Sequence, residues 1–241
     1  MVRVIDLDFH DQRPFLIMDH LEGPTRREFS QWSPLKTSEA IQWVIDLCYA
    51  VAEAHKQSII HRDIKPANIV IVDGTPILID FGLAISTDLH PNPVESGAAG
   101  TISYMSPEQT HLDQSKIGPT TDVFGLGAVL FYLLENQSPL RAANPGKTIT
   151  VQNARQFGGE AISSMVAHHS CGDILVRALS NNPADRYKNA IDFAEALTAI
   201  QPKSHQRPTL TKKNSEKLSI GCPASQASGA TSPINFLFPL K

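Results

Sequence analysis

Cysteine is scarce in this chain and long apolar runs are missing. Cys48, Cys171 and Cys222 are the three cysteines among 241 residues. An odd number at irregular intervals provides no disulfide framework and suits a reducing compartment. No run approaches the roughly 18 to 20 apolar residues of a membrane span, and residues 1–6 lack the basic then apolar order of a signal peptide. These absences predict a cytoplasmic protein without a membrane span.

Long blocks of one charge sign are also missing. The chain has 21 Lys and Arg against 24 Asp and Glu, which gives a net charge of −3 and a pI near 6.3. Without a basic block, nothing favours nucleic acid or an anionic membrane as the main partner. The hydrophobic content of 41% is sufficient for a core. We therefore expect a folded protein.

The first third of the chain mixes strand and helix patterns. Two apolar stretches, residues 2–5 and 15–18, predict a β-hairpin. Residues 39–56 carry apolar side chains at three- and four-residue steps, which predicts a mostly buried amphipathic helix with Thr37 or Ser38 as its cap. Three β-branched runs predict short strands at residues 59–60, 69–72 and 77–79. Residues 73–76 predict a turn between the second and the third of them.

The remainder of the chain is predominantly helical in pattern. Residues 123–134 are almost continuously apolar, and a helix that is apolar all round belongs in a core. Further helices are expected at about 174–179 and 189–200. After Ile200 the composition shifts to Lys, Ser, Thr, Gln and Pro, which predicts a disordered tail over 201–241.

Two polar motifs lie on loops beside the short strands: His61-Arg62-Asp63-Ile64-Lys65-Pro66-Ala67-Asn68 and Asp80-Phe81-Gly82. They resemble the catalytic loop and the metal-binding motif of bacterial-type serine/threonine protein kinases. The resemblance covers about residues 1–200. It implies the α+β protein-kinase-like fold, with a mainly α-helical C-lobe and a remnant of the β-rich N-lobe. The implied activity is ATP-dependent phosphoryl transfer to serine or threonine hydroxyls of a protein substrate, with Mg²⁺.

The resemblance assigns a role to each polar residue of these motifs. Asp63 would accept the proton of the attacking hydroxyl as general base, and Lys65 would face the phosphoryl group in transfer. Lys65 also favours a protein kinase over a small-molecule phosphotransferase. Asn68 and Asp80 would supply oxygen ligands to Mg²⁺, which is a hard cation.

The N-terminal stretch resembles the last two strands and the hinge of a kinase N-lobe. Met18 stands at the position that gates the adenine pocket, and Asp19 to Leu21 correspond to the hinge backbone. The chain is accordingly divided into an N-lobe remnant, a C-lobe and a tail: 1–22, 23–200 and 201–241.

Further residues match structural positions of the family. Gly100-Thr101 and Ser106-Pro107-Glu108 resemble the end of an activation segment, and Arg186 fits the arginine that pairs with Glu108 in a buried, structural ion pair. Asp122 matches the aspartate that holds the catalytic-loop backbone. Arg62 implies a basic pocket for a phosphorylated activation segment, for which the candidate sites are Ser86, Thr87 and Ser96.

Several residues have a simpler structural interpretation. His61 is expected to be a packed residue, because the transfer already has its base in Asp63. His168-His169 with Cys171 could suggest zinc, but no second ligand pair lies at suitable spacing, so no zinc site is predicted. Cys48 lies within the buried stripe of its helix and is expected in the core.

The chain departs from the family pattern before the catalytic loop. The family uses a glycine-rich loop, a strand lysine and a helix glutamate to hold the ATP phosphates. Here the first lysine is Lys36 and the first glycine is Gly23, and neither lies in a strand at the required place. We therefore expect impaired transfer by this chain alone.

Three explanations of that departure remain open from the sequence. A late start or a broken reading frame would mean that the true protein has a complete N-lobe. A catalytically weak pseudokinase would use the N-lobe remnant to bind a protein partner that covers it. A small-molecule phosphotransferase is the third, and both Lys65 and the Glu108–Arg186 match count against it.

Overall fold

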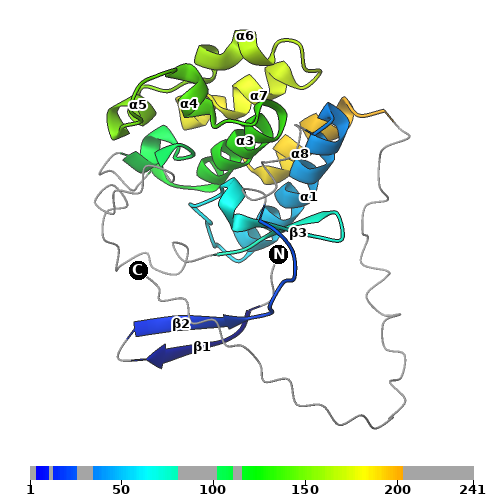
Figure 1. The fold of residues 1–241 in the computed structure, drawn as a ribbon, viewed down its shortest axis with the longest axis vertical. Helices are drawn as coiled ribbons and strands as arrows, with labels where there is room; N and C mark the ends of the chain where they lie inside the picture. Colours follow the sequence, from blue (N-terminus) through cyan, green and yellow to red (C-terminus); the bar gives the residue numbers. More distant parts are fainter. Residues whose placement is uncertain (1–3, 11–12, 26–34, 81–101, 111–115, 203–241) are drawn as a thin grey trace.

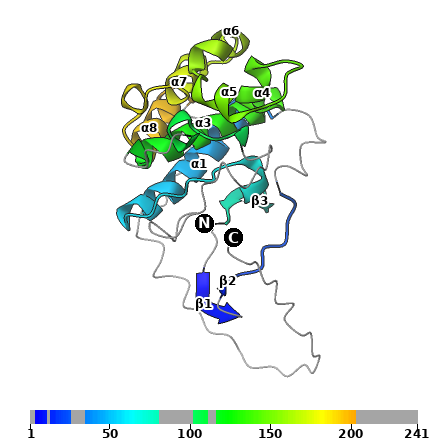
Figure 2. The same ribbon diagram turned by 90° about the vertical axis from the view of Figure 1, so that its left-hand side faces the viewer.

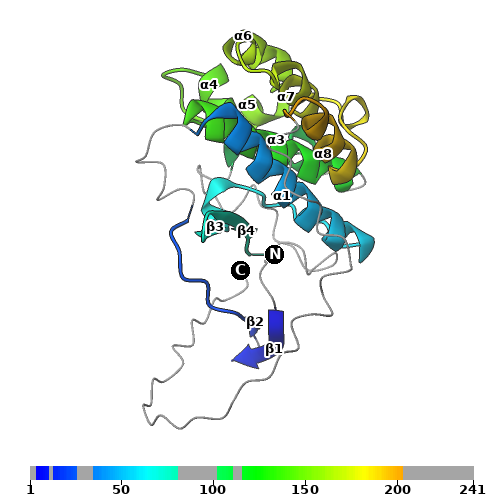
Figure 3. The same ribbon diagram turned by 90° about the vertical axis from the view of Figure 1, so that its right-hand side faces the viewer.

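The computed structural model describes residues 4–10, 13–25, 35–80, 102–110 and 116–202. The helices pack together in one body, and the N-terminal hairpin lies apart from them in all three views (Figure 1, Figure 2, Figure 3). Within these ranges the structure is mostly helical with two small two-stranded sheets, as the sequence predicted. None of the helices in the described ranges is long and apolar enough to cross a membrane.

The N-terminal hairpin consists of β1 (Val4–His10) and β2 (Arg13–Met18), which pair antiparallel. The predicted hairpin is confirmed, but its first strand is longer than expected. His10 pairs with Arg13, so the ladder continues through residues that the polarity pattern placed in the connection. Backbone groups form this ladder whatever the polarity of the side chains.

The first helix, α1 (Thr37–Lys56), packs its apolar face against α3 (Pro119–Glu135) and α8 (Ala190–Ala199). Cys48 is fully buried in that face, as predicted. The predicted cap is wrong: Lys36 occupies the N-cap position, and no side chain of the described residues caps this end. The Thr37 hydroxyl instead lies 3.0 Å from Nδ1 of His169, because a tertiary contact replaces the local one.

The second hairpin joins β3 (Ile69–Val72) to β4 (Thr75–Leu78). Asp73 and Gly74 turn the chain with φ of 49° and 74°, which suits a tight hairpin turn. The strand expected at residues 59–60 is not formed. Ile59 is exposed, and its N–H donates to the Ala54 carbonyl, so this segment ends α1.

Helix α3 forms the centre of the C-terminal body and is buried almost all round, as its apolar sequence predicted. A Cβ on Gly125 would lie 2.9 Å from Cβ of Ile64. Glycine therefore allows α3 to approach the segment that carries the catalytic motif.

The remaining elements surround α3 (Figure 1, Figure 2). Helix α7 (Gly172–Ala178) and α8 confirm the helices predicted near 174–179 and 189–200. The Asn189 side chain accepts a hydrogen bond from the N–H of Asp192 at 2.9 Å and caps α8. The shorter helices and 3₁₀ turns are α4 (Pro139–Ala143), α5 (Val151–Arg155), α6 (Ser163–Val166), η2 (Pro66–Asn68), η3 (Pro107–Thr110), η5 (Gly159–Ile162) and η6 (Pro183–Asp185).

Some predictions fall outside the described residues. These include Phe81, Gly82, the segment with Ser86, Thr87, Ser96 and Thr101, and the tail from 203 onward. The division into an N-lobe remnant, a C-lobe and a tail stays a prediction.

Candidate active site

The Asp122 carboxylate holds the backbone of the loop at residues 61–63. It is almost fully buried and accepts the N–H groups of His61 at 2.8 Å and Arg62 at 2.9 Å. The His55 ring nitrogen Nε2 lies 2.8 Å from the same carboxylate. Asp122 belongs to the first turn of α3, so the loop is attached to the most buried helix of the protein. The predicted role of Asp122 is confirmed.

Arg62 has a strained backbone, with a φ of 66°. This left-handed conformation costs an L-residue roughly 1–2 kcal/mol. Side chains hold it on both sides: its N–H donates to Asp122, and its carbonyl accepts from Nε2 of Gln109 at 2.6 Å. Such strain persists only where the surroundings hold it in place, and it clusters at functional sites.

Three of the predicted site residues meet directly after Arg62. The Lys65 ammonium group donates to Oδ2 of Asp63 at 2.6 Å. Nδ2 of Asn68 donates to the same oxygen at 3.0 Å and to the Asp63 carbonyl at 2.8 Å. These contacts orient the Asp63 carboxylate, while the side chains of Asp63 and Lys65 keep 13% and 18% of their surface exposed. Asp63 is thus fixed in place and still accessible.

Asp80 is brought beside this loop by the backbone. The Ile79 N–H donates to the Asn68 carbonyl at 2.9 Å, and the Ile79 carbonyl lies 3.3 Å from Nε2 of His61. Asp80 follows directly, exposed and with a φ of 62°. Asp80 is therefore held close to Asn68, because the preceding residue Ile79 is hydrogen-bonded to Asn68.

The donor chemistry of Asn68 and Asp80 fits Mg²⁺. Among the described residues, both hydrogen bonds of the Asn68 amide group use Nδ2, which leaves its Oδ1 as a ligand atom. The Asp80 carboxylate adds a second hard oxygen donor.

His61 is a packed residue, as expected. Its side chain is fully buried and lies between the Ile79 carbonyl and the Asp63 N–H. Burial lowers the pKa of His61, although the negative charges of Asp122 and Asp63 oppose that effect. His61 is therefore neutral at physiological pH.

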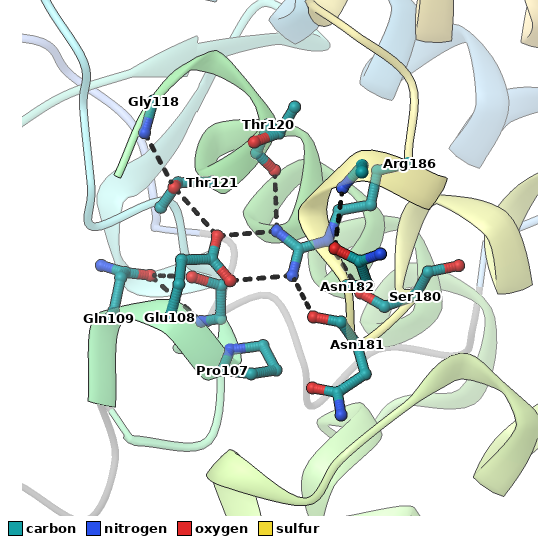
Figure 4. A network of polar contacts seen from close by, with 12 residues as sticks. Pro107, Glu108, Gln109, Gly118, Thr120, Thr121, Ser180, Asn181, Asn182 and Arg186 are labelled. Carbon is teal, nitrogen blue, oxygen red and sulfur yellow. Dashed lines mark hydrogen bonds and ion pairs between the residues drawn. The ribbon is translucent and has the colours of Figure 1, made fainter. Parts of the chain in front are cut away.

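A buried ion pair lies behind the loop (Figure 4). Arg186 binds Glu108 with two parallel hydrogen bonds of 2.7 and 2.8 Å, and Thr121 donates to the same carboxylate at 2.9 Å. Burial alone raises the pKa of Glu108, but the hydrogen bonds and the charge of Arg186 outweigh it and hold the pKa below its usual value. The predicted pair is confirmed as a buried, structural contact.

The guanidinium group of Arg186 has further acceptors. It donates to the backbone carbonyls of Thr120, Ser180 and Asn181 at 3.0, 2.8 and 3.1 Å (Figure 4). It also lies 4.9 Å from the centre of the Phe124 ring. The pair thus joins the segment before α3 to the segment between α7 and α8.

Gln109 was missed by sequence reasoning. Its Oε1 accepts from the N–H and the hydroxyl of Ser106 at 3.0 Å, and its Nε2 donates to Arg62. One glutamine thereby couples the end of the segment at 102–110 to the catalytic loop. Nothing in the sequence distinguishes Gln109 from a surface glutamine, because its partners come from a distant segment.

The hinge candidates lie at the end of the N-terminal hairpin. Met18 is the last residue of β2 and pairs with Val4, while Asp19 and Leu21 follow as half-buried residues. Their role in binding adenine stays a prediction.

Comparison with known proteins agrees with this geometry. The model of the protein kinase domain family matches residues 1–218. The chain belongs to the protein kinase family. Among curated proteins, this kinase chain is 31% identical over 195 residues to the serine/threonine-protein kinase PknB of Mycobacterium tuberculosis, covering 78% of this chain and 30% of PknB. It is 30% identical over 210 residues to the serine/threonine-protein kinase Pkn1 of Myxococcus xanthus, covering 82% of this chain and 29% of Pkn1.

Solved structures support the kinase fold. The kinase domain of Mycobacterium tuberculosis PknI superposes with a TM-score of 0.63 at 21% sequence identity, covering 83% of this chain and 72% of that one. At this identity the likeness shows the fold alone. The chain spans about a third of the length of the curated relatives it matches.

Proposed function

We propose that this kinase chain catalyses ATP-dependent phosphoryl transfer to serine or threonine hydroxyls of proteins. The observation that carries the proposal is the position of Asp63, whose carboxylate is oriented by Lys65 and Asn68 on a loop attached to Asp122. Phosphoryl transfer depends chiefly on positioning and charge stabilisation, and this loop supplies both.

Each residue of the loop has a defined task in this proposal. Asp63 accepts the proton of the attacking hydroxyl and orients its oxygen toward the phosphorus. The Lys65 ammonium group, which donates to Asp63 in this structure, would contact the transferred phosphoryl group and neutralise part of its charge. Mg²⁺, held by Asn68 and Asp80, would neutralise the phosphate charges. Met18, Asp19 and Leu21 would contact the adenine.

The direct test is phosphorylation of a serine- and threonine-containing protein with Mg²⁺ and labelled ATP. We expect Asp63→Asn to lower the rate by roughly 10²- to 10⁴-fold, the usual contribution of a general base. Asp73→Asn is the matched control, because Asp73 lies exposed in the β3–β4 turn. Equal rates for Asp63→Asn and the parent would refute the assignment.

Arg62 supports a regulatory role for the segment that precedes Ser106. Its Nε is buried and has no hydrogen-bond partner in the part of the chain that the structure describes. A phosphate on Ser86, Thr87 or Ser96 would supply the missing acceptor and bring negative charge to the guanidinium group. The phosphate would then fill the basic pocket at Arg62, beside Asp63.

A second candidate is a kinase-like protein that binds a partner and transfers phosphate weakly or not at all. It is favoured by the β1–β2 hairpin, where Ile5 and Ile17 are 58% and 38% exposed and present apolar surface that a partner would bury. The partner would cover the hairpin. Partner binding that needs no Mg·ATP and survives Asp80→Ala would favour this candidate over the enzyme.

The cellular location belongs to the same proposal. The cysteine pattern favours a reducing environment, which is the cytoplasm.

A further inference from the structure

A cluster of nitrogen and oxygen ligands lies at the end of α3 far from Asp122. Glu135 is the last residue of α3, and His168 and His169 lie in the turn between α6 and α7. Their ligand atoms all lie within 4.8 Å of one another. Glu135 is 13 residues beyond Asp122 on the same helix, which places the cluster about 20 Å from the catalytic loop.

The distances suit one small metal ion. Nε2 of His169 lies 2.9 Å from Oε1 of Glu135, and Nε2 of His168 lies 4.0 Å from the same oxygen. Ligands around tetrahedral Zn²⁺ lie about 3.3 Å apart for bonds near 2.0–2.1 Å. The observed distances bracket that value, so small side-chain rotations would complete the geometry.

A second contact orients one of the histidines. The Thr37 hydroxyl lies 3.0 Å from Nδ1 of His169 and can accept a hydrogen bond from an N–H at that position. That tautomer leaves the lone pair of Nε2 directed at the cluster. Hydrogen bonds of this kind to the remote ring nitrogen are typical of histidines that bind metals.

An ion pair between His169 and Glu135 would be the simplest alternative, but it leaves His168 unexplained. The two histidine rings lie side by side with centroids 4.0 Å apart, and both present Nε2 to the same carboxylate. Two imidazoles and a carboxylate form a donor set that suits zinc, whereas magnesium and calcium are bound by oxygen donors.

We propose that Glu135, His168 and His169 form a zinc site with one coordination position left for water. The metal would link the end of α3 to the α6–α7 turn, and Thr37 would tie the site to the start of α1. Helices α1 and α7 both pack against α3 (Figure 1, Figure 3). The site is separate from the phosphoryl-transfer residues and does not depend on the proposed activity.

Cys171 is not part of the site. It is buried, and its sulfur is not among the ligand atoms that lie within 4.8 Å of one another. The third ligand beside the two histidines is Glu135. It lies 34 residues from His169 in sequence, so the local spacing of histidines and cysteines does not reveal it.

The test is calorimetric titration of Zn²⁺ into the 241-residue chain after removal of metals with EDTA. We expect binding that His168→Ala, His169→Ala and Glu135→Gln each abolish or weaken at least about 100-fold. Thr37→Val should weaken it by about 10- to 100-fold, and Thr37→Ser should restore it. The control is His20→Ala, which removes an exposed histidine outside the cluster.

His168 keeps the test independent of folding, because its side chain is 66% exposed and its removal leaves the core intact. Zn²⁺ at a hundredfold excess over Kd should also raise the Tm of the parent by about 5–10 °C, and this rise should vanish in His168→Ala. Unchanged Zn²⁺ affinity in His168→Ala and Glu135→Gln, or no Zn²⁺ binding by the parent, would overturn the proposal.

Discussion

Removing the charge of Glu108 should destabilise the protein strongly, because it leaves Arg186 charged inside the core. Both side chains are almost completely buried, at 2% and 0% exposure, and they share two hydrogen bonds below 3 Å. Breaking a buried pair from one side costs roughly 3–5 kcal/mol. We therefore expect Glu108→Gln to lower the free energy of unfolding by about 3–5 kcal/mol.

The measurement is urea unfolding followed by circular dichroism, with thermal unfolding as a second readout. A chain of this size loses about 2–4 °C in Tm per kcal/mol, so the Tm should fall by roughly 6–20 °C. The matched control is Glu53→Gln, which breaks an exposed pair with Lys56 and should cost about 1 kcal/mol or less. If Glu108→Gln costs no more than this control, the reasoning is wrong.

A double variant separates the charge from the packing. In Glu108→Met with Arg186→Met, neither charge remains buried, so the double variant should be more stable than the single variant Glu108→Met. The opposite order would mean that the carbonyls of Thr120, Ser180 and Asn181 are sufficient to satisfy Arg186 alone.

The same pair sets an acid limit to stability. The pKa of Glu108 is lower in the folded protein than in the unfolded chain. Its contribution is therefore complete above the ordinary carboxyl pKa of about 4.3 and is lost as the pH falls through the lowered value. The stability difference between the parent and Glu108→Gln should shrink as the pH falls below about 4. A constant difference down to pH 2 would contradict the shift.

Three further predictions concern the loop and its support. Asp122→Asn leaves one carbonyl oxygen to accept from the N–H groups of His61 and Arg62. The variant should lower the free energy of unfolding in urea by about 1–3 kcal/mol and should lower the phosphorylation rate. Full activity would exclude Asp122 as the support of the loop. Gly125→Ala places a Cβ against Ile64 and should lower the free energy of unfolding by about 1–3 kcal/mol. Gly118→Ala is the control, because no described atom lies within 4 Å of its Cβ, and it should cost about 1 kcal/mol or less. Equal Tm values for the two variants would argue against close packing at Gly125. Burial lowers the pKa of His61 in the folded protein, so the unfolded chain binds a proton at this residue at higher pH than the folded protein does. The free energy of unfolding should therefore fall as the pH drops below about 6.5. Equilibrium unfolding at pH 7 and pH 5 should show a smaller loss of stability for His61→Gln than for the parent.

Local patterns predicted the long elements well. Helices α1 and α3 follow from apolar spacing that persists over several turns, and the β3–β4 hairpin follows from a turn signal between two β-branched runs. Short signals were less reliable. Residues 59–60 have the composition of a strand but end α1, and Thr37 has the character of a cap but contacts His169. Thr37 has a partner distant in sequence, whereas Ile59 bonds to Ala54 at the end of the preceding helix.

The sequence by itself brings together the groups that we propose for the chemistry. Asp63, Lys65 and Asn68 lie within six residues, so the connecting backbone alone keeps them near one another. The tertiary structure decided everything that depends on distant partners: the attachment of the loop to Asp122, the strained Arg62 held by Gln109, and the meeting of Glu135 with His169. Hydrogen bonds and ion pairs act over a few ångströms in space, and only the packing of α1, α3 and α7 brings these residues within that range.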